Sequence, residues 1–404
     1  MTKILLILIL FFQSGYAFLI TQNNYEEQAS VLKKFDIDSS FLRDQKIISM
    51  KENMGRYKTK HFLRVLKNGN RFVPYLRKLI NKSGIPSAFL YMAMAESNFT
   101  PDAYSKSRAS GMWQFMPYTA KKFGLKINKY LDERRDPIKS TIAAIKYLKY
   151  LHKIFGKWYL AALAYNCGEG RVLRGIKRAK TDNLETLLNP KRKYVPRESR
   201  LYIRKILMMQ NMANSPDFIL ENNSAYLLNQ GSAETFSKVL VKQGTSLSSI
   251  ASSIGISLKE LKAYNPQLRY YFVPPKIGKY HIYIPYNKQI AFKQNFNPKK
   301  SKGRFFAYRV KRGDSLQRIG KKYRISYRVL REFNHLKSNL LHINQSLVIP
   351  AIKLPTISYI IRNGDTLGKI SRKYKVAINK IIRVNHKKST MIKIGEKLVI
   401  PQIY

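Results

Sequence analysis

The sequence is poor in cysteine, in acidic side chains and in long apolar runs, and each shortage excludes something. The only cysteine is Cys167, so the 404-residue chain can form neither an internal disulfide nor a cysteine-based zinc site. The six histidines lack the HExxH spacing of a zinc site, so we expect no metal and no cofactor. Because 45% of the residues are hydrophobic and 12% aromatic, the chain can still build the cores of two or more domains.

The most pronounced apolar run is short and lies at the start, in MTKILLILILFFQSGYA. A basic residue precedes the run from Ile4 to Phe12, and the small residues Gly15 and Ala17 follow it. This pattern predicts a secretory signal, residues 1–17, cleaved after Ala17. The run is short for a membrane span, and no cysteine follows that could carry a lipid anchor. An uncleaved anchor is the alternative.

Acidic residues are scarce throughout the chain. Lys and Arg outnumber Asp and Glu by 75 to 23, which gives a net charge of +52, and residues 236–404 alone hold 35 basic and 5 acidic side chains. Such a chain attracts polyanions, and nucleic acid is the usual partner. A secreted chain meets anionic cell-wall and membrane surfaces first, so we expect these and no nucleic acid. A proteome rich in lysine would also explain much of the charge.

The C-terminal part contains an internal repeat with a period of 51 residues. YRVKRGDSLQRIGKKY recurs as YIIRNGDTLGKISRKY, and the matching pairs are Gly313 and Gly364, Asn334 and Asn385, and Pro350 and Pro401. A weaker copy begins at Val239. Alternating apolar residues, helix N-cap residues (Asp314 and Ser315, Asp365 and Thr366) and helical spacing predict strand, helix, helix, strand in each copy.

These copies resemble LysM domains through the GDSL or GDTL opening, the helix ending in Asn and the LVIP close. The resemblance implies binding of N-acetylglucosamine in chitin or peptidoglycan, in a groove between the first strand-helix loop and the second helix-strand loop. The implied contact residues are Gly313, Asp314, Ser315, Leu316, Ile343 and Asn344 in one copy, and Gly364, Asp365, Thr366, Leu367, Ile394 and Gly395 in the next. Whether the first copy binds glycan is left open, because it has Gln243 and Thr245 where the other copies have charged residues.

Residues 70–215 have helical patterns instead. We expect helices from Pro86 to about Glu96, from Asp136 to Gly156, from Trp158 to Tyr165 and from Arg200 to Met212. Residues 18–69 are expected to be a helical or extended lead-in without an assigned task.

One carboxylate stands on an apolar face of the first of these helices. In FLYMAMAES, Phe89, Met92, Ala93 and Glu96 are related by steps of three and four. Burial and the negative end of the helix dipole both disfavour the charged form, so we expect a raised pKa and a carboxylic acid able to donate a proton. The alternative is a buried glutamate bonded to a backbone amide or an arginine.

Two clusters follow Glu96, GMWQFMPYTA and AYNCGEGRV. Gln114 and Asn166 offer hydrogen bonds, and Trp113, Phe115 and Tyr165 are expected to offer apolar or stacking surface to sugar rings. Taken one at a time, each cluster is equally typical of core packing beside a turn.

The series ESNF, GMWQFM, AYNCGEGRV and RESRLYIRKI resembles the lysozyme-like lytic transglycosylases of glycoside hydrolase family 23. The resemblance implies that Glu96 is the single catalytic acid and base. It also implies that the substrate-binding residues are Gly111, Gln114, Met116, Tyr165, Asn166, Gly168 and Tyr202. Cys167 is interpreted as packing, because no basic partner stands near it in the sequence.

Most glycosidases need two carboxylates. Glu169, beside the second cluster, is interpreted as a turn or helix-cap residue, and the implied transglycosylase reaction needs only Glu96. This implied reaction cleaves the bond between N-acetylmuramic acid and N-acetylglucosamine and leaves 1,6-anhydro ends. The alternatives are a hydrolase of the goose-lysozyme kind and a non-catalytic wall-binding protein.

The expected architecture is α+β and multidomain. A mainly α-helical, lysozyme-like domain over residues 70–215 precedes three βααβ modules over residues 236–286, 306–350 and 357–401. The expected protein is a periplasmic monomer bound to peptidoglycan glycan strands.

Overall fold

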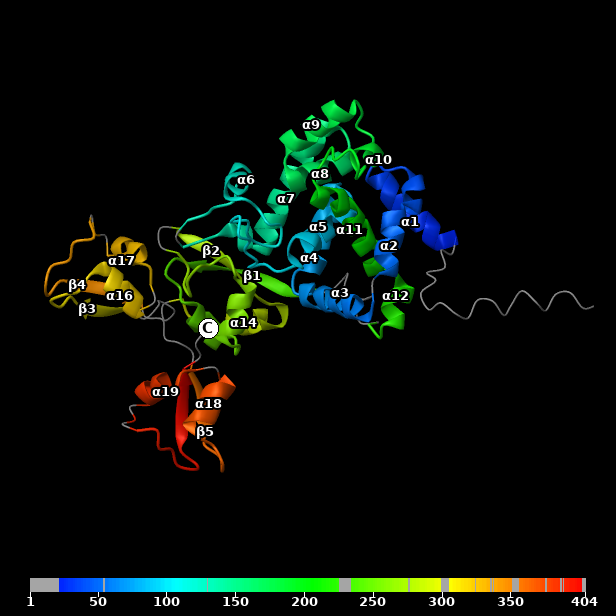
Figure 1. Ribbon diagram of the computed structural model, residues 1–404. Coiled ribbons are helices and arrows are strands. Elements are labelled where there is room, and N and C mark those ends of the chain that lie inside the picture. Colours follow the sequence, from blue (N-terminus) through cyan, green and yellow to red (C-terminus); the bar gives the residue numbers. More distant parts are fainter. Residues whose placement is uncertain are drawn as a thin grey trace, which may run out of the picture. The chain divides into compact units, whose positions relative to one another are not determined.

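The computed structural model describes residues 22–401, except residues 54, 129, 225–233, 275–276, 299–304, 324, 335, 337, 351–355, 375, 386 and 388 (Figure 1). The expected signal segment, residues 1–17, therefore lies outside the described residues. The chain divides into two compact units: Met1–Ile127 with Asp132–Thr235, and Asn128–Leu131 with Phe236–Tyr404. Each unit is considered by itself.

The first unit is helical. Its α-helices are α1 (Gln22–Lys34), α2 (Gln45–Glu52), α3 (Arg56–Gly69), α4 (Val73–Ser83), α5 (Leu90–Ser97), α6 (Pro117–Lys122), α7 (Pro137–Phe155), α8 (Trp158–Cys167), α9 (Glu169–Ala179), α10 (Leu184–Leu187), α11 (Arg197–Asn214) and α12 (Pro216–Glu221). In the part of this unit that the structure describes, short 3-10 helices join them: η1 (Ser39–Arg43), η2 (Ser87–Phe89) and η3 (Glu133–Arg135). Among the described residues, its β structure is limited to isolated bridges around residues 104–115 and 127–132.

Local sequence signals explain where the predicted helices begin and end. The Asp136 carboxylate accepts hydrogen bonds from the backbone N–H groups of Ile138 and Lys139, and Gly156 ends α7 in the left-handed conformation, at φ 70°. The helix predicted from Pro86 to Glu96 is confirmed with one difference. Pro86 precedes the 3-10 helix η2, and α5 begins only at Leu90.

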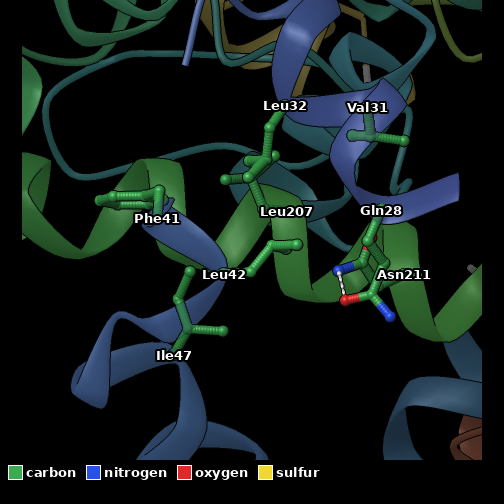
Figure 2. Close-up of a pocket in the computed structure, with 8 residues that line it drawn as sticks. All are labelled: Gln28, Val31, Leu32, Phe41, Leu42, Ile47, Leu207 and Asn211. Atoms are coloured by element: carbon green, nitrogen blue, oxygen red, sulfur yellow. Dashed lines mark hydrogen bonds between the residues drawn. The ribbon is translucent and has the colours of Figure 1, made fainter. Parts of the chain in front are cut away.

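The N-terminal segment, which the sequence left without a task, packs on α11. The Arg204 guanidinium donates to both carboxylate oxygens of Asp44, at 2.9 and 2.7 Å. Asn211 Nδ2 donates to Gln28 Oε1 at 3.2 Å. Figure 2 shows this hydrogen bond beside a small hollow, which is lined by apolar side chains of α1, η1, α2 and α11: Val31, Leu32, Phe41, Leu42, Ile47 and Leu207. Residues 22–52 therefore brace the helix that carries Tyr202.

The second unit holds three modules of the predicted strand, helix, helix, strand order. They are β1 (Phe236–Lys242), α13 (Leu247–Ser253), α14 (Leu258–Tyr264) and β2 (Lys279–Pro285); β3 (Phe305–Arg309), α16 (Leu316–Tyr323), α17 (Tyr327–Phe333) and β4 (Ser346–Pro350); and β5 (Thr356–Ile360), α18 (Leu367–Tyr374), α19 (Ile378–Val384) and β6 (Lys397–Pro401). After β2 come the 3-10 helix η5 (Tyr286–Lys288) and α15 (Gln289–Asn295). Each module pairs its two strands antiparallel around an apolar core, and residues 130 and 272 add to the core of the second module.

An asparagine at the end of the second helix ties that helix to the closing strand. In the first module, Asn265 Oδ1 accepts from the Tyr283 backbone N–H at 2.9 Å, and its Nδ2 donates to the Tyr283 carbonyl at 2.7 Å. Asn385 makes the same pair of bonds to Val399 in the third module, both at 2.6 Å. The divergent first copy therefore keeps the interaction that joins the module's two halves.

The ion pair between Asp44 and Arg204 is expected to stabilise the first unit strongly. Their side chains are only 14% and 11% exposed, so Asp44→Asn leaves a largely desolvated guanidinium without its counter-charge. We expect a loss of about 2–4 kcal/mol in the free energy of unfolding, measured by urea denaturation at neutral pH.

The pair of Lys157 and Asp182 provides the matched control, because its side chains are 39% and 43% exposed. Asp182→Asn should cost less than about 1 kcal/mol. Burial opposes ionisation of Asp44, but hydrogen bonds from Arg204 and the Ile47 amide keep the pKa of Asp44 below its ordinary value. Its contribution is therefore present above the unfolded-state pKa and is lost as the pH falls through the lower folded-state pKa. Equal losses in the two variants would contradict the bracing role.

Candidate active site

Glu96 lies in the last turn of α5, as predicted. Met92 and Ala93, one turn earlier, are fully buried, and Asn98 ends the helix in the left-handed conformation at φ 52°. The Ser97 hydroxyl lies 2.8 Å from the carbonyl oxygen of Met112, which ties the end of α5 to the loop that carries Gln114. The carboxylate thus sits between an apolar helix and a fixed loop.

The partner of Glu96 is a tyrosine, not the arginine or backbone amide of the alternative interpretation. Tyr202 on α11 donates its hydroxyl to Glu96 Oε1 at 2.7 Å. Burial raises the pKa of Glu96, the Tyr202 hydrogen bond and Lys205 counteract this in part, and the charge of Glu198 raises the pKa further. The net result is a raised pKa, so Glu96 holds its proton at higher pH than an ordinary glutamate.

A tight loop presents Gln114. Gln114 itself has φ 46°, and its Nε2 donates to the Gly111 carbonyl at 2.8 Å. Gly111 has φ 87°, and a Cβ there would stand 1.8 Å from the carbonyl oxygen of Arg134. Only glycine fits this position, and the close approach is to the chain's own backbone. Asp132 holds the Arg134 guanidinium, which also donates to carbonyls of the loop.

The end of α8 supplies the second cluster. The Tyr165 hydroxyl donates to the Trp113 carbonyl at 2.7 Å, so α8 also fixes the Gln114 loop. Burial raises the pKa of Tyr165 well above its usual value, and the charge of Glu96 adds to this, which puts the two groups in one electrostatic site. Asn166 Oδ1 accepts from the Ser199 hydroxyl at 2.6 Å, and Gly168 turns the chain at φ 90°.

The expectation that Trp113 and Phe115 offer stacking surface is wrong. Trp113 is completely buried, with its Nε1 donating to the Thr141 hydroxyl at 2.8 Å, and Phe115 is 2% exposed. Both are core residues, because the loop turns them inward. Met116, by contrast, is 45% exposed at the start of α6.

The sequence patterns did not single out Ser97, Tyr147, Glu198 or Ser199. The ring of Tyr147 lies 5.2 Å from that of Tyr165, and burial, with the charge of Glu169, raises its pKa to about 12. Apart from Glu96, the motifs contain Glu198 as well as Glu169, and the charge of Glu198 raises the pKa of Glu96. A signal for Ser199 was present: it precedes Tyr202 by three residues, which places both on one helical face.

The predicted glycan-binding loops of the second and third modules have matching geometry. Gly313 and Gly364 have φ 83° and 78°, and Asn344 and Gly395 have φ 68° and 81°. The backbone N–H of Asn344 donates to the Val310 carbonyl at 2.8 Å, and that of Gly395 donates to Ile361 in the same way. Ile343 and Ile394 are 62% and 70% exposed beside these turns. Leu316 and Leu367 are buried, so only their backbone can reach a ligand.

The aspartates of these loops do not cap helices. Asp314 Oδ2 accepts from the Lys311 backbone N–H and from the Tyr308 hydroxyl, both at 2.8 Å, so it closes the turn after the strand. Ser315 Oγ is the helix cap, accepting from the Arg318 N–H at 3.2 Å. The third module repeats these contacts with Tyr359, Arg362, Asp365, Thr366 and Lys369.

Neither a metal cluster nor a membrane-crossing helix is found in the described part of the chain. Among the residues that the structure describes, no three His, Cys, Asp or Glu side chains gather as metal ligands. Over the same residues, no helix combines the length and the hydropathy that a membrane crossing requires.

Family comparisons agree with the fold. The transglycosylase SLT domain matches residues 74–187, the LysM-like domain of the lytic transglycosylase MltD matches residues 235–300, and the LysM domain matches residues 308–350 and 359–401. The chain is a lytic transglycosylase of the SLT type with C-terminal LysM domains.

Particular relatives match most of the chain or a part of it. The chain is 29% identical over 352 residues to membrane-bound lytic murein transglycosylase D of Escherichia coli, covering 80% of this chain and 74% of that protein. It is 36% identical over 99 residues to an N-acetylmuramoyl-L-alanine amidase of Staphylococcus saprophyticus, covering 22% of this chain and 30% of that protein. The 70 kDa soluble lytic transglycosylase of E. coli superposes with a TM-score of 0.28 at 19% identity, over 51% of this chain and 30% of that one. The fold assignment therefore rests on the domain matches.

The raised pKa of Glu96 predicts a pH-dependent cost to stability. A carboxyl whose folded-state pKa is raised stabilises the fold below its unfolded-state pKa, and that contribution is lost as the pH rises through the folded-state pKa. Glu96→Gln has no such loss, so its free energy of unfolding minus that of the wild type should grow with pH above about 4.5. The growth should be about 1.4 kcal/mol for each pH step of one until the folded-state pKa is passed. Urea denaturation across pH 4–8 measures it.

Tyr202→Phe tests how the Tyr202 hydroxyl contributes to the pKa of Glu96. Without the hydroxyl that favours the carboxylate, the pKa of Glu96 should rise further, and the pH range over which the difference grows should extend upward. A difference that stays constant with pH would show that the pKa of Glu96 is not shifted, and one that shrinks would show that it is lowered; either result contradicts the prediction.

Proposed function

We propose that the chain cleaves the β-1,4 bond between N-acetylmuramic acid and N-acetylglucosamine in peptidoglycan, without water, and leaves 1,6-anhydro-N-acetylmuramic acid ends. The observation that carries the proposal is the Glu96 carboxyl, held by Tyr202 in a largely desolvated position with a raised pKa. Such a group keeps its proton to higher pH than an ordinary glutamate, so it can donate that proton and take one back.

In the proposed reaction Glu96 acts twice. It first gives its proton to the bridging oxygen, and the bond from that oxygen to C1 of the muramic acid breaks. The carboxylate then takes the proton of the C6 hydroxyl of the same sugar, and O6 bonds to C1 to close the anhydro ring. The cycle returns Glu96 to its protonated state, so one carboxyl suffices. Tyr202 holds that carboxyl and favours the ionised form that exists between the two steps.

The other predicted residues bind substrate in this proposal. Gln114 and Asn166 offer amide groups to the sugar, and the exposed Met116 lines the cleft. Tyr165 acts through its fixed place beside Glu96 and the loop. Gly111 and Gly168 permit the turns that set these side chains, since both have positive φ.

The LysM modules attach the enzyme to its polymer. Each exposed turn offers an isoleucine and backbone groups to a glycan, and modules in one chain add their affinities through a high effective concentration. With the expected signal at residues 1–17, the protein acts in the periplasm on the peptidoglycan layer. The strongly basic surface would add attraction to anionic wall or membrane surfaces.

The reaction is tested by digesting purified sacculi with the enzyme and measuring the masses of the released muropeptides by mass spectrometry. We expect anhydro products, each lighter by one water than the product of a hydrolase. Glu96→Gln should lower the rate about 10²–10⁴-fold, because it removes the transferable proton, while binding to insoluble peptidoglycan is retained.

Two variants separate this mechanism from one with two carboxylates. Glu169→Gln and Glu198→Gln remove the other acids of the motifs, and both should still release anhydro products. Hydrated products, or loss of activity in either variant comparable to that of Glu96→Gln, would favour a hydrolase of the goose-lysozyme kind. Digestion by Glu96→Gln at the wild-type rate would refute the assignment of Glu96.

Glycan attachment is tested at the two exposed isoleucines. The double variant Ile343→Ser with Ile394→Ser should fold normally, because both side chains face solvent, yet bind sacculi about tenfold more weakly in a sedimentation assay. Ile290→Ser, an exposed residue of α15 outside these turns, is the matched control. Equal binding by the double variant and this control would place the glycan contact elsewhere.

A further inference from the structure

The hydroxyl of Ser199 makes a contact that none of the predicted roles uses. Ser199 is 1% exposed in the first turn of α11, and its Oγ lies 2.6 Å from Oδ1 of Asn166, which is 33 residues earlier in the last turn of α8. Tyr202 stands three residues after Ser199, about 4.5 Å further along the helix axis. One face of α11 therefore bonds to two groups of the site: Tyr202 to the Glu96 carboxyl and Ser199 to the Asn166 amide.

An asparagine side chain can present either of two ends. Its Oδ1 accepts hydrogen bonds and its Nδ2 donates them, and the two ends have nearly the same shape. Only the neighbouring groups decide which end points where. A serine hydroxyl that donates to Oδ1 fixes the amide with Nδ2 on the opposite side.

The surroundings of Ser199 favour the donating direction. Burial raises the pKa of the Cys167 thiol, next to Asn166, and a hydrogen bond from Ser199 counteracts this only in part, so the thiol keeps its hydrogen. A neutral thiol sulfur is a weak acceptor, so the hydroxyl hydrogen of Ser199 goes to the amide oxygen of Asn166, 2.6 Å away. The contacts of the described residues give Asn166 Nδ2 no acceptor within the protein, and Asn166 is only partly buried.

We propose that Ser199 is a positioning residue that locks the Asn166 amide with Nδ2 facing the cleft, ready for an acceptor oxygen of the glycan such as an acetamido carbonyl. This inference rests on the proposed function. With the opposite orientation, Oδ1 would face the sugar oxygen and repel it. The buried hydroxyl therefore sets the polarity of a substrate contact that it does not touch.

A double-mutant cycle tests the proposal through the initial rate of anhydro-muropeptide release from sacculi. Ser199→Ala should lower the rate about tenfold, the usual size of one oriented hydrogen bond. Ser199→Thr keeps the hydroxyl and should stay within about threefold of the wild type. In the Asn166→Ala background, Ser199→Ala should cost nothing more, because no amide is left to orient.

A control variant separates the proposed orienting role from a general loss of packing. Ser140→Ala, which removes another buried serine hydroxyl, from α7, controls for loss of packing and should keep the wild-type rate. The inference is overturned if Ser199→Ala keeps full activity, if its effect is undiminished in the Asn166→Ala background, or if Asn166→Ala itself is fully active. A wild type that releases no anhydro products would instead overturn the proposed function, and this inference with it.

Discussion

The hydrogen bond from the Tyr202 hydroxyl to Glu96 is the interaction on which the site depends. It joins two helices, α5 and α11, that are 106 residues apart in the chain. It also settles a conflict, because burial pushes Glu96 toward the neutral form while the proposed reaction needs the carboxylate for part of each cycle. A neutral hydroxyl stabilises the carboxylate moderately, whereas an arginine in its place would hold the group ionised and remove its proton. The choice of partner therefore keeps both protonation states within reach.

The long helix α11 collects the supporting contacts. Ser199 and Tyr202 bond to the site, while Arg204, Leu207 and Asn211 receive the N-terminal segment through Asp44, the hollow in Figure 2 and Gln28. A shift of this helix by one ångström would lengthen the Tyr202 bond beyond a useful distance. The residues before α4 thus have a physical task, although the catalytic motifs lie elsewhere.

Sequence patterns predicted the helical domain, the repeated modules and the position of Glu96, because those features depend on local spacing. A carboxylate on an apolar helical face has few explanations, and the period of 51 residues admits only repeated units. The patterns failed where the answer depended on which way a side chain turns. Trp113 and Phe115 alternate with Gln114 in a loop, and only the positive φ of Gln114 and Gly111 decides that both aromatic rings point inward. The partners of Glu96 and Asn166 were hidden for a similar reason, since contacts between α11 and the earlier helices have no local signature.

Most of the few acidic side chains of the modules are used within the modules themselves. Asp314 and Asp365 each accept a backbone N–H and a tyrosine hydroxyl, and Glu396 is bonded to Lys387 and the Lys393 amide. Three of the five acids in residues 236–404 are therefore bound within their own modules, and the 35 basic side chains of this part outnumber its acids sevenfold. Such a surface attracts anionic polymers at long range and loses this attraction as salt rises. In the proposed function the turns with Ile343 and Ile394 act only at contact, so long-range charge would bring the enzyme to the wall and contact at these turns would select the glycan.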